Sequence, residues 1–340
     1  MEPPIILHHF EGSLFSQKIV WTLSIKKLKW TSVIVSPINK QRPLLQLLVH
    51  GYRRVPILQI GSDIFIDTKL IMEELERRYP EPSIFPKRNG SDKSDKGLSL
   101  AMSTWVDNYI FSSTFILLPI GSKEPSKPKL FSTKEFVEDR SSLIGAPINV
   151  EKRASERSYH LDKIRISLDW IELQFSDDRD WFLDTPYPGI ADIHVAMNLW
   201  FYDILQIAKE VANSKLYPKT YSWLSRFLKY VKSNGIKPEK ISGEEALEVA
   251  KKFKPFNGGK MKIEQDPNDI NKRKLGDNVI IVPDDYGKTP VIGKIVSLSN
   301  SRIGIRPHGV DKTGIEVVTW FPRAGYVIKP DNGLIGVGKL

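Results

Sequence analysis

The feature that most restricts the fold of this chain is the order of apolar segments in its first 80 residues. Short apolar runs predict strands, and apolar residues that recur every three or four positions predict helices. These rules predict strands at residues 5–10, 30–35, 55–60 and 63–66, and helices at 15–28, 43–49 and 68–78. Such an order predicts a mixed sheet with helices on both faces.

The rest of the chain contains two further regions with different patterns. The first seven segments match a thioredoxin-like layout, which we assign to residues 1–86. Residues 95–255 are mainly helical in pattern and predict an all-helical domain. Five short β-branched runs within residues 270–340, separated by turn residues, predict a small SH3-like β-barrel. The expected fold class is therefore α/β plus all-α plus small all-β.

Composition narrows the classes of function. The chain has 340 residues, 41% of them hydrophobic, and a net charge of +10. Because no segment concentrates the basic residues, nucleic acid is not an expected partner. No apolar run reaches the roughly 20 residues that cross a bilayer. The N-terminus shows no signal peptide, so we expect a cytoplasmic protein that does not bind membranes.

The absence of cysteine restricts the chemistry further. It excludes disulfides, thiolate metal sites and a thiol nucleophile belonging to the chain itself. No residue spacing supports a metal site, so no metal is expected. The sequence also contains no phosphate-binding loop and no dinucleotide fingerprint.

The start of the first predicted helix is a candidate anion site. Ser13 lies in E-G-S-L-F-S-Q-K-I, between the first strand and this helix. A helix start leaves backbone N–H groups unpaired, and the helix dipole adds positive potential there. A thiolate is stabilised at such a point, and in a chain without cysteine the thiol would belong to a substrate. Serine also suits an ordinary helix cap, so both roles stay open.

Four motifs resemble those of cytosolic glutathione transferases. S-L-F-S-Q-K-I, from Ser13, is similar to the serine-type motif of tau-class members and the cysteine-type motif of omega-class members. Val55-Pro56 resembles the cis-proline loop of the family, and I-D-T-K-L-I-M-E-E-L-E-R-R-Y-P resembles the motif that follows it. D-W-F-L-D followed by G-I-A-D-I-H-V-A-M resembles the signature of the helical domain. The motifs occur in the family order within residues 5–232.

The resemblance implies an enzyme that uses glutathione as co-substrate. Ser13 would donate a hydrogen bond to the glutathione sulfur and lower the thiol pKa from its usual value of about 8.5. A hundredfold gain in thiolate requires about 2.7 kcal/mol, which one charge-assisted hydrogen bond and the helix dipole can supply. Ser16 is the rival donor. The thiolate would attack a small hydrophobic electrophile, as in detoxification, with conjugation and isomerase or lyase chemistry both open.

The resemblance also assigns residues that would bind glutathione. Val55 precedes Pro56 and would offer its backbone to the cysteinyl part. Asp67 and Thr68 replace the usual Glu-Ser pair and would bind the γ-glutamyl end. The glycine carboxylate requires a basic residue, and the candidates are Lys40, Arg42 and, best aligned with the family, Arg54.

Three positions depart from the family pattern. Leu14 stands where proline is common, which makes the turn into the helix less rigid. Ser13 replaces the omega-class cysteine and removes the mixed-disulfide step. Gly189 replaces the Ser or Thr that usually forms a capping box with Asp192. We interpret Asp192 as a buried structural carboxylate. His8-His9 is interpreted as part of the strand, with one ring exposed.

The acceptor pocket has no readable motif, and we expect it between the first two domains. Its aromatic candidates are Phe10, Trp105, Tyr109 and Tyr202. The resemblance implies a homodimer. Two alternatives remain: a non-enzymatic scaffold or regulatory protein that uses the same fold, and a nucleic-acid or ribosome-associated protein that acts through the C-terminal barrel.

Overall fold

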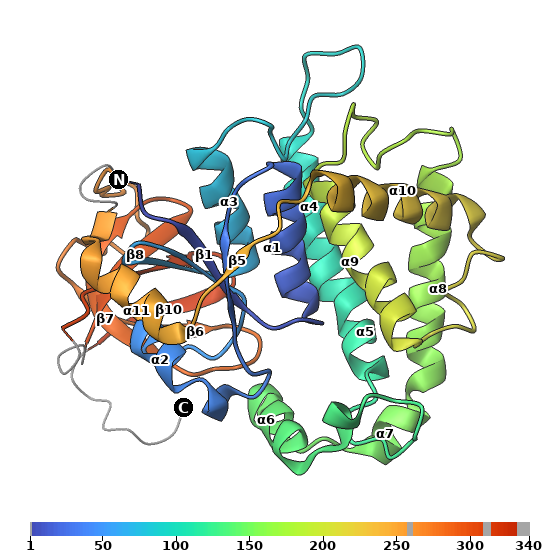
Figure 1. Ribbon diagram of the computed structural model, residues 1–340, viewed down its shortest axis with the longest axis horizontal. Coiled ribbons are helices and arrows are strands. Elements are labelled where there is room, and N and C mark those ends of the chain that lie inside the picture. Colours follow the sequence, from blue (N-terminus) through green and yellow to red (C-terminus); the bar gives the residue numbers. More distant parts are fainter. Residues whose placement is uncertain (1, 257–260, 309–313, 332–340) are drawn as a thin grey trace.

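The computed structural model describes residues 2–256, 261–308 and 314–331. Figure 1 shows a β-rich side and a helical side, with the first and last strands of the chain, β1 and β10, both on the β-rich side. No helix of the described residues is long and apolar enough to cross a membrane.

The first seven predicted segments form a thioredoxin-like unit. Its elements are β1 (Ile5–His9), α1 (Leu14–Ile25), β2 (Thr31–Ile34), η1 (Asn39–Gln41), α2 (Pro43–Val49), β3 (Ile57–Ile60), β4 (Asp63–Ile66) and α3 (Thr68–Arg78). Strand β1 pairs in parallel with β2 and antiparallel with β3, and β3 pairs antiparallel with β4. The predicted mixed sheet is confirmed.

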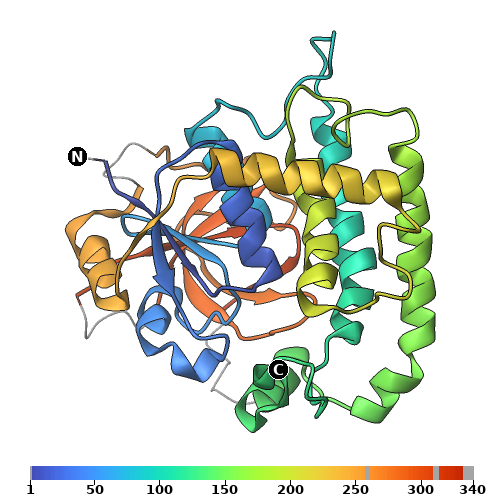
Figure 2. The same cartoon turned by 45° about the vertical axis from the view of Figure 1, so that its right-hand side comes forward.

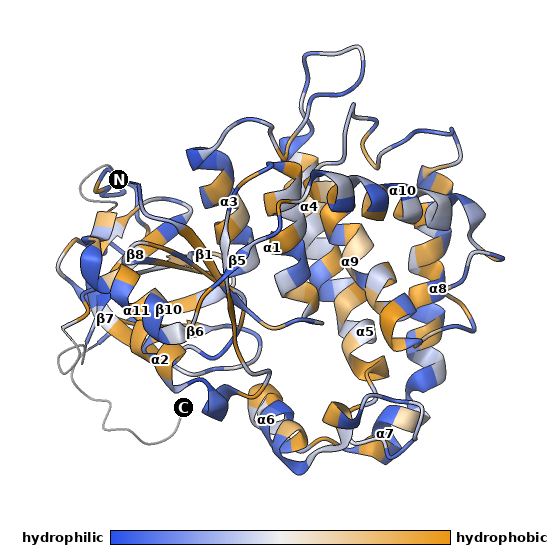
Figure 3. Ribbon diagram, viewed as in Figure 1, coloured by the Kyte–Doolittle hydropathy of each residue, from blue (hydrophilic) through white to orange (hydrophobic). Residues whose placement is uncertain are grey.

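Alternating side chains of this sheet enter different cores, because neighbouring residues of a strand point to opposite faces. Leu58 and Phe65 pack with α1 and α3, whereas Ile57 and Ile64 pack with residues of α2. Both faces are therefore apolar, as expected for a sheet covered on both sides. Figure 3 shows strands of this sheet in the hydrophobic colour, with helices of mixed hydropathy beside them.

The helical side packs around one apolar helix. Its elements are α4 (Lys96–Trp105), η2 (Val106–Ile110), α5 (Phe111–Leu117), η3 (Lys129–Ser132), α6 (Lys134–Ile144), α7 (Val150–Ser155), α8 (Arg157–Gln174), α9 (Ile190–Leu205) and α10 (Pro218–Asn234). Helix α9 is buried on nearly all sides. Trp21 of α1 packs edge-on against Trp200 and Phe227, at centroid distances of 5.7 and 5.0 Å. Figure 2 shows α10 extending across the helical side to α1.

The last part of the range expected to be helical returns to the sheet. Strand β5 (Glu239–Lys240) pairs in parallel with β2, and α11 (Gly243–Lys252) follows it. Ala246 of α11 packs with Ile6 and Val33. The expected domain 95–255 thus includes a segment that the structure places with the thioredoxin-like unit.

The C-terminal strands extend the same sheet. They are β6 (Asn278–Pro283), β7 (Val291–Leu298), β8 (Arg302–Pro307), β9 (Val318–Pro322) and β10 (Tyr326–Pro330). They pair antiparallel in the order β10-β6-β7-β8-β9, and β9 then pairs in parallel with β4, giving one ten-stranded sheet. The positions of the strands are confirmed, but the SH3-like barrel is not. The edge of β4 offers unpaired backbone groups, and β9 satisfies them.

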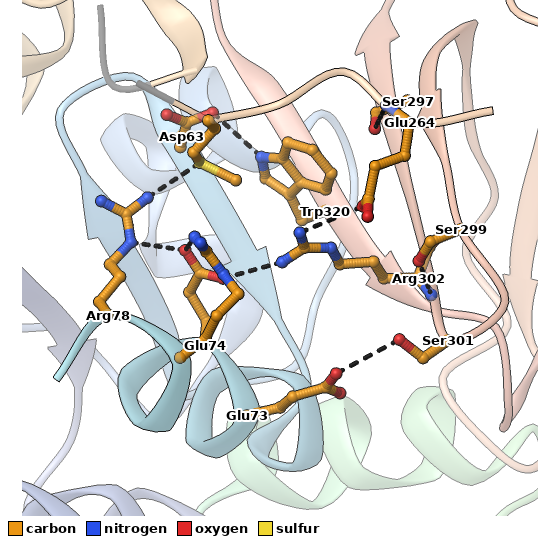
Figure 4. A network of polar contacts seen from close by, with 12 residues as sticks. Asp63, Glu73, Glu74, Arg78, Glu264, Ser297, Ser299, Ser301, Arg302 and Trp320 are labelled. Carbon is orange, nitrogen blue, oxygen red and sulfur yellow. Dashed lines mark hydrogen bonds and ion pairs between the residues drawn. The ribbon is translucent and has the colours of Figure 1, made fainter. Parts of the chain in front are cut away.

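Buried polar contacts strengthen this join (Figure 4). Trp320 donates from its indole nitrogen to Asp63 at 3.0 Å. The fully buried carboxylate of Glu74 accepts hydrogen bonds from Arg77 and Arg78 of its own helix and from Arg302 of β8. A buried carboxylate needs such partners, so α3 and β8 are linked by charge as well as by packing.

Candidate functional site

The strand register brings the predicted glutathione-binding segments to one edge of the sheet. His8 pairs with Ile57, and Ile57 pairs with Ile66, both antiparallel. His9 pairs in parallel with Ile34. The segments that follow β1, β2 and β4 and the segment that precedes β3 therefore leave the sheet at the same edge. These segments carry Ser13, Lys40, Arg42, Arg54, Val55, Pro56, Asp67 and Thr68.

Ser13 caps α1. Its backbone is extended, with φ −80° and ψ 121°, and its hydroxyl accepts from the backbone N–H of Ser16 at 3.3 Å. Accepting this bond uses a lone pair of the oxygen, so the hydroxyl hydrogen stays free to donate. The rival, Ser16, is only 2% exposed, and within the described part of the chain its hydroxyl has no hydrogen-bond partner. Ser13, which is 8% exposed, is the less buried of the two candidate serines.

Two further predicted positions lie in the expected local structures. The Val55–Pro56 peptide bond is cis. Asp67 caps α3 with φ 76°, and its carboxylate accepts from the backbone N–H of Lys69 at 2.9 Å. Burial raises the pKa of Asp67, the Lys69 N–H opposes this rise, and the nearby Asp107 adds to it. Thr68 follows as the first, buried residue of the helix.

The three basic candidates have different surroundings. Arg42 is buried and donates to the backbone carbonyls of Ser36 and Arg53, which makes it a structural residue. Lys40 is exposed on η1. Arg54 forms an ion pair with Asp285, a residue of the C-terminal region. Arg54 is thus the one of these three candidates that forms an ion pair with an acidic side chain in the described structure.

A buried charged cluster missed by the sequence analysis lies behind this edge. Lys18 of α1 is fully buried and forms an ion pair with Asp107 of η2. His194 of α9 lies with Nδ1 3.9 Å from Oδ1 of Asp107. Burial lowers the pKa of His194 well below its usual range, and Lys18 lowers it further, so the ring is neutral.

One sequence signal could have revealed part of this cluster. Lys18 lies three residues after Phe15 and one before Ile19, both apolar positions of α1. A lysine on the buried side of a helix requires a partner. Nothing in the sequence pattern indicates Asp107, because the π-helical turn η2 that carries it interrupts the helical period.

The acceptor-pocket candidates do not lie together. Tyr202 is wrong as a pocket residue: it is 2% exposed, and its hydroxyl is 2.8 Å from that of Thr114, within the helical core. Trp105 and Tyr109 instead pack around Trp170 of α8, at 6.1 and 6.3 Å. Phe10 is half-buried, and its carbonyl accepts from the backbone N–H of Ser13.

Another aromatic pair lies between the two sides of the molecule. Phe15 of α1 and Phe111 of α5 meet edge-on at 4.8 Å, and both are half-buried. The sequence analysis included Phe15 only as the first residue of the helix predicted at 15–28. The pair depends on the packing of two domains, so local periodicity could not indicate it.

Asp192 has the structural role that was predicted. It is 1% exposed and accepts from the backbone N–H groups of Phe182 and Gly189, each at 2.9 Å, and from the Trp223 indole at 2.8 Å. Burial raises its pKa to about 6, although these hydrogen bonds oppose the rise. The carboxylate joins the start of α9 to α10 and to the segment before α9.

The two neighbouring histidines are both buried, so the expectation of one exposed ring was wrong. His8 is 2% exposed and lies 2.8 Å from Gln59, and His9 is 7% exposed and lies 2.9 Å from Ser32. Among the residues that the structure describes, no group of three or more His, Cys, Asp or Glu side chains could hold a metal ion.

Comparisons with known proteins agree with this architecture. Residues 7–83 match the glutathione S-transferase N-terminal domain, and residues 122–235 match a domain of unknown function. A probable glutathione S-transferase from Nicotiana tabacum is 29% identical over 101 residues, which are 30% of this chain and 43% of that protein. Glutathione S-transferase DHAR2 from Arabidopsis thaliana is 31% identical over 70 residues, 21% of this chain and 32% of that protein. The chain thus spans less than half of the length of either relative.

A solved structure matches over a greater length. A GST-like protein from Pseudomonas syringae superposes with a TM-score of 0.71 at 26% identity and covers 96% of this chain and 99% of its own. That coverage includes C-terminal strands that lie beyond the matched N-terminal domain. The chain therefore carries a glutathione S-transferase N-terminal domain, is similar over nearly its whole length to a GST-like protein, and has an additional C-terminal region.

Proposed function

We propose that the chain binds glutathione at the edge formed by the ends of β1, β3 and β4, and that Ser13 holds its sulfur as a thiolate. The observation that carries this proposal is the register of the sheet, which places Ser13, Val55 and Asp67 at one edge. Each belongs to a segment that can offer a polar group to a peptide. The helix start beside Ser13 adds N–H groups and positive potential for a bound anion.

Each part of glutathione has a partner of matching chemistry. The backbone of Val55 would pair with the cysteinyl unit, as a strand pairs with an added strand. Asp67 would accept from the γ-glutamyl ammonium, and the Thr68 hydroxyl and the start of α3 would bind its carboxylate. Arg54 would face the glycine end.

The thiolate would then attack an electrophilic, largely apolar acceptor. In a substitution, the new carbon–sulfur bond forms as the leaving group departs with the electron pair of the broken bond. In an addition to an activated double bond, the π electrons move to the neighbouring atom, which then takes a proton from water. The half-buried pair of Phe15 and Phe111 offers an apolar surface between the domains, near the start of α1. A homodimer, which the family resemblance implies, and a cytoplasmic location remain part of this proposal.

The test is calorimetric titration of the full chain with reduced glutathione. We expect saturable binding below about 1 mM, and a roughly tenfold weaker affinity for Asp67→Asn, because a charged hydrogen bond is lost. Asparagine still caps a helix, so α3 should stay intact. Asp162→Asn, on the exposed side of α8, is the matched control. An absence of binding at millimolar glutathione would refute the proposal.

A further inference from the structure

The loop between β6 and β7 reaches from the added C-terminal strands to the glutathione-binding edge. Asp285 of this loop accepts two hydrogen bonds from the guanidinium of Arg54, one of them 3.3 Å long. The ring of Tyr286 lies under the same guanidinium, with its centroid 4.1 Å from Cζ. A paired and stacked arginine has little freedom left to bind another anion.

Further contacts hold the loop in place. The backbone N–H of Gly287 donates to the carbonyl of Leu143 of α6 at 2.6 Å. A Cβ at Gly287, where φ is +64°, would lie 3.0 Å from Leu143 and 3.2 Å from Nε of Arg54. The loop therefore lies between the β3 side of the site and the helical side, and the close approach requires glycine.

The electrostatic surroundings of Tyr286 place it near the predicted binding residues. Burial raises its pKa to about 12; Arg54 opposes this rise, and the carboxylates of Asp285, Asp107 and Asp67 contribute to it. Tyr286 therefore shares the local field of Asp67, which would receive the γ-glutamyl end of glutathione.

We propose that Asp285 and Tyr286 of the C-terminal region are specificity determinants of the glutathione site. They neutralise Arg54 and enclose the end of the site that would receive the glycine carboxylate. The site then binds γ-glutamylcysteinyl thiols with a neutral far end, such as an ester or an amide, with an affinity similar to its affinity for glutathione. This inference rests on the proposed glutathione-binding function.

The experiment compares two ligands that differ only in this carboxylate: glutathione and its glycine ethyl ester. Both are titrated calorimetrically into the full chain. For the natural sequence we expect dissociation constants within about threefold of each other, because Arg54 is already paired. For Asp285→Asn we expect glutathione to bind about tenfold more tightly than the ester, because the released guanidinium gains a charged partner.

Two further variants make the result specific. The control variant Asp284→Asn makes the same change of charge one residue earlier. Asp284 is exposed, and its side chain has no partner in the described part of the chain. This variant should therefore show the ligand preference of the natural sequence. Adding Arg54→Met to Asp285→Asn should abolish the new preference for glutathione. The 48% exposure of the Asp285 side chain makes misfolding of its variant unexpected.

The possible failures can be told apart. If both ligands bind but Asp285→Asn and Asp284→Asn show the same preference, the specificity role is wrong while the glutathione-binding function stands. A tenfold preference for glutathione in the natural sequence would also overturn it, because Arg54 would then be available. If neither ligand binds any variant at millimolar concentration, the proposed function fails and this inference fails with it.

Discussion

Arg302 of β8 donates from Nη1 to Oε2 of Glu74 on α3, at 2.9 Å, and both side chains are buried. The pair connects the added strands to the thioredoxin-like unit. Burial raises the pKa of Glu74, but the arginines around it outweigh that effect, and the net pKa is lowered. The carboxylate is thus charged in the folded protein.

Removing Arg302 should weaken the whole molecule. We expect Arg302→Met to lower the free energy of unfolding by about 2–4 kcal/mol, because a buried carboxylate loses one of its partners. Urea unfolding measures the change. Arg306→Met is the control, since Arg306 is exposed on the same strand and should change stability by less than about 0.5 kcal/mol. Equal effects of the two variants would contradict a role for the ion pair.

The two candidate hydroxyls of α1 should respond in opposite ways. Ser13→Ala should reduce conjugation of an aromatic halide by about 100-fold, because the thiol loses the donor that keeps it ionised. Ser16→Ala should keep that activity and leave stability unchanged or up to about 1 kcal/mol higher, because it removes a buried hydroxyl without a partner in the described structure. Loss of activity in Ser16→Ala alone would reverse the assignment.

Acid should destabilise the protein through His8. Burial lowers the pKa of His8 to about 4, whereas an unfolded histidine titrates near 6.5. Between these values the unfolded chain binds the extra proton, so stability is lost as the pH falls. From pH 7.5 to pH 5 this loss is on the order of 2 kcal/mol.

The corresponding test is urea unfolding of His8→Gln at both pH values. Glutamine can still reach Gln59 but does not titrate, so the variant should lose about 2 kcal/mol less than the natural sequence on acidification. His308→Gln, at an exposed position, should behave like the natural sequence. If the pH dependence of His8→Gln is unchanged, the acid sensitivity has another source.

The carboxylate of Asp192 should be needed for folding and not for chemistry. Asp192→Asn replaces one of the two accepting oxygens by an amide N–H₂ group, which then faces at least one of the three hydrogen-bond donors, and we expect it to cost about 2–4 kcal/mol in urea unfolding. The variant should retain the affinity for glutathione wherever it remains folded. A stable variant with no glutathione binding would show that the residue acts at the ligand site.

Local patterns in the sequence were sufficient for the thioredoxin-like unit. The predicted bounds at 43–49, 63–66 and 68–78 are those observed, because each element shows its own period and a turn residue or cap at its end. Strand β5 was missed because two residues, Glu239 and Lys240, are too few to show a period. These two residues form a strand because they pair with β2, and a pairing between distant segments cannot be predicted from local sequence.

Long-range pairing explains the part of the fold that the sequence did not indicate. The C-terminal strands were located correctly, but their spacing is equally compatible with a closed barrel and with an extended sheet. The parallel pairing of Phe65 with Trp320 shows that these strands continue the thioredoxin-like sheet, and no local pattern indicates this pairing. The departure of Gly189 from the family pattern also has a long-range cause. A Cβ at residue 189 would lie 2.9 Å from Pro86, and the sequence does not indicate this contact.

The candidate site could be proposed from the sequence only where the family motifs carry it. Ser13, Val55 and Asp67 each follow or precede a strand whose pattern is clear. Asp107 and Asp285 come from segments with no motif, and they meet Lys18 and Arg54 only because distant elements pack together.

The pairing of β4 with β9 has a consequence for synthesis on the ribosome. Strand β4 emerges early, whereas its partner lies about 250 positions later in the chain. Until that partner arrives, an apolar strand presents an open ladder of backbone groups, a surface prone to intermolecular association. The nascent chain should thus depend on chaperones until β9 has been made.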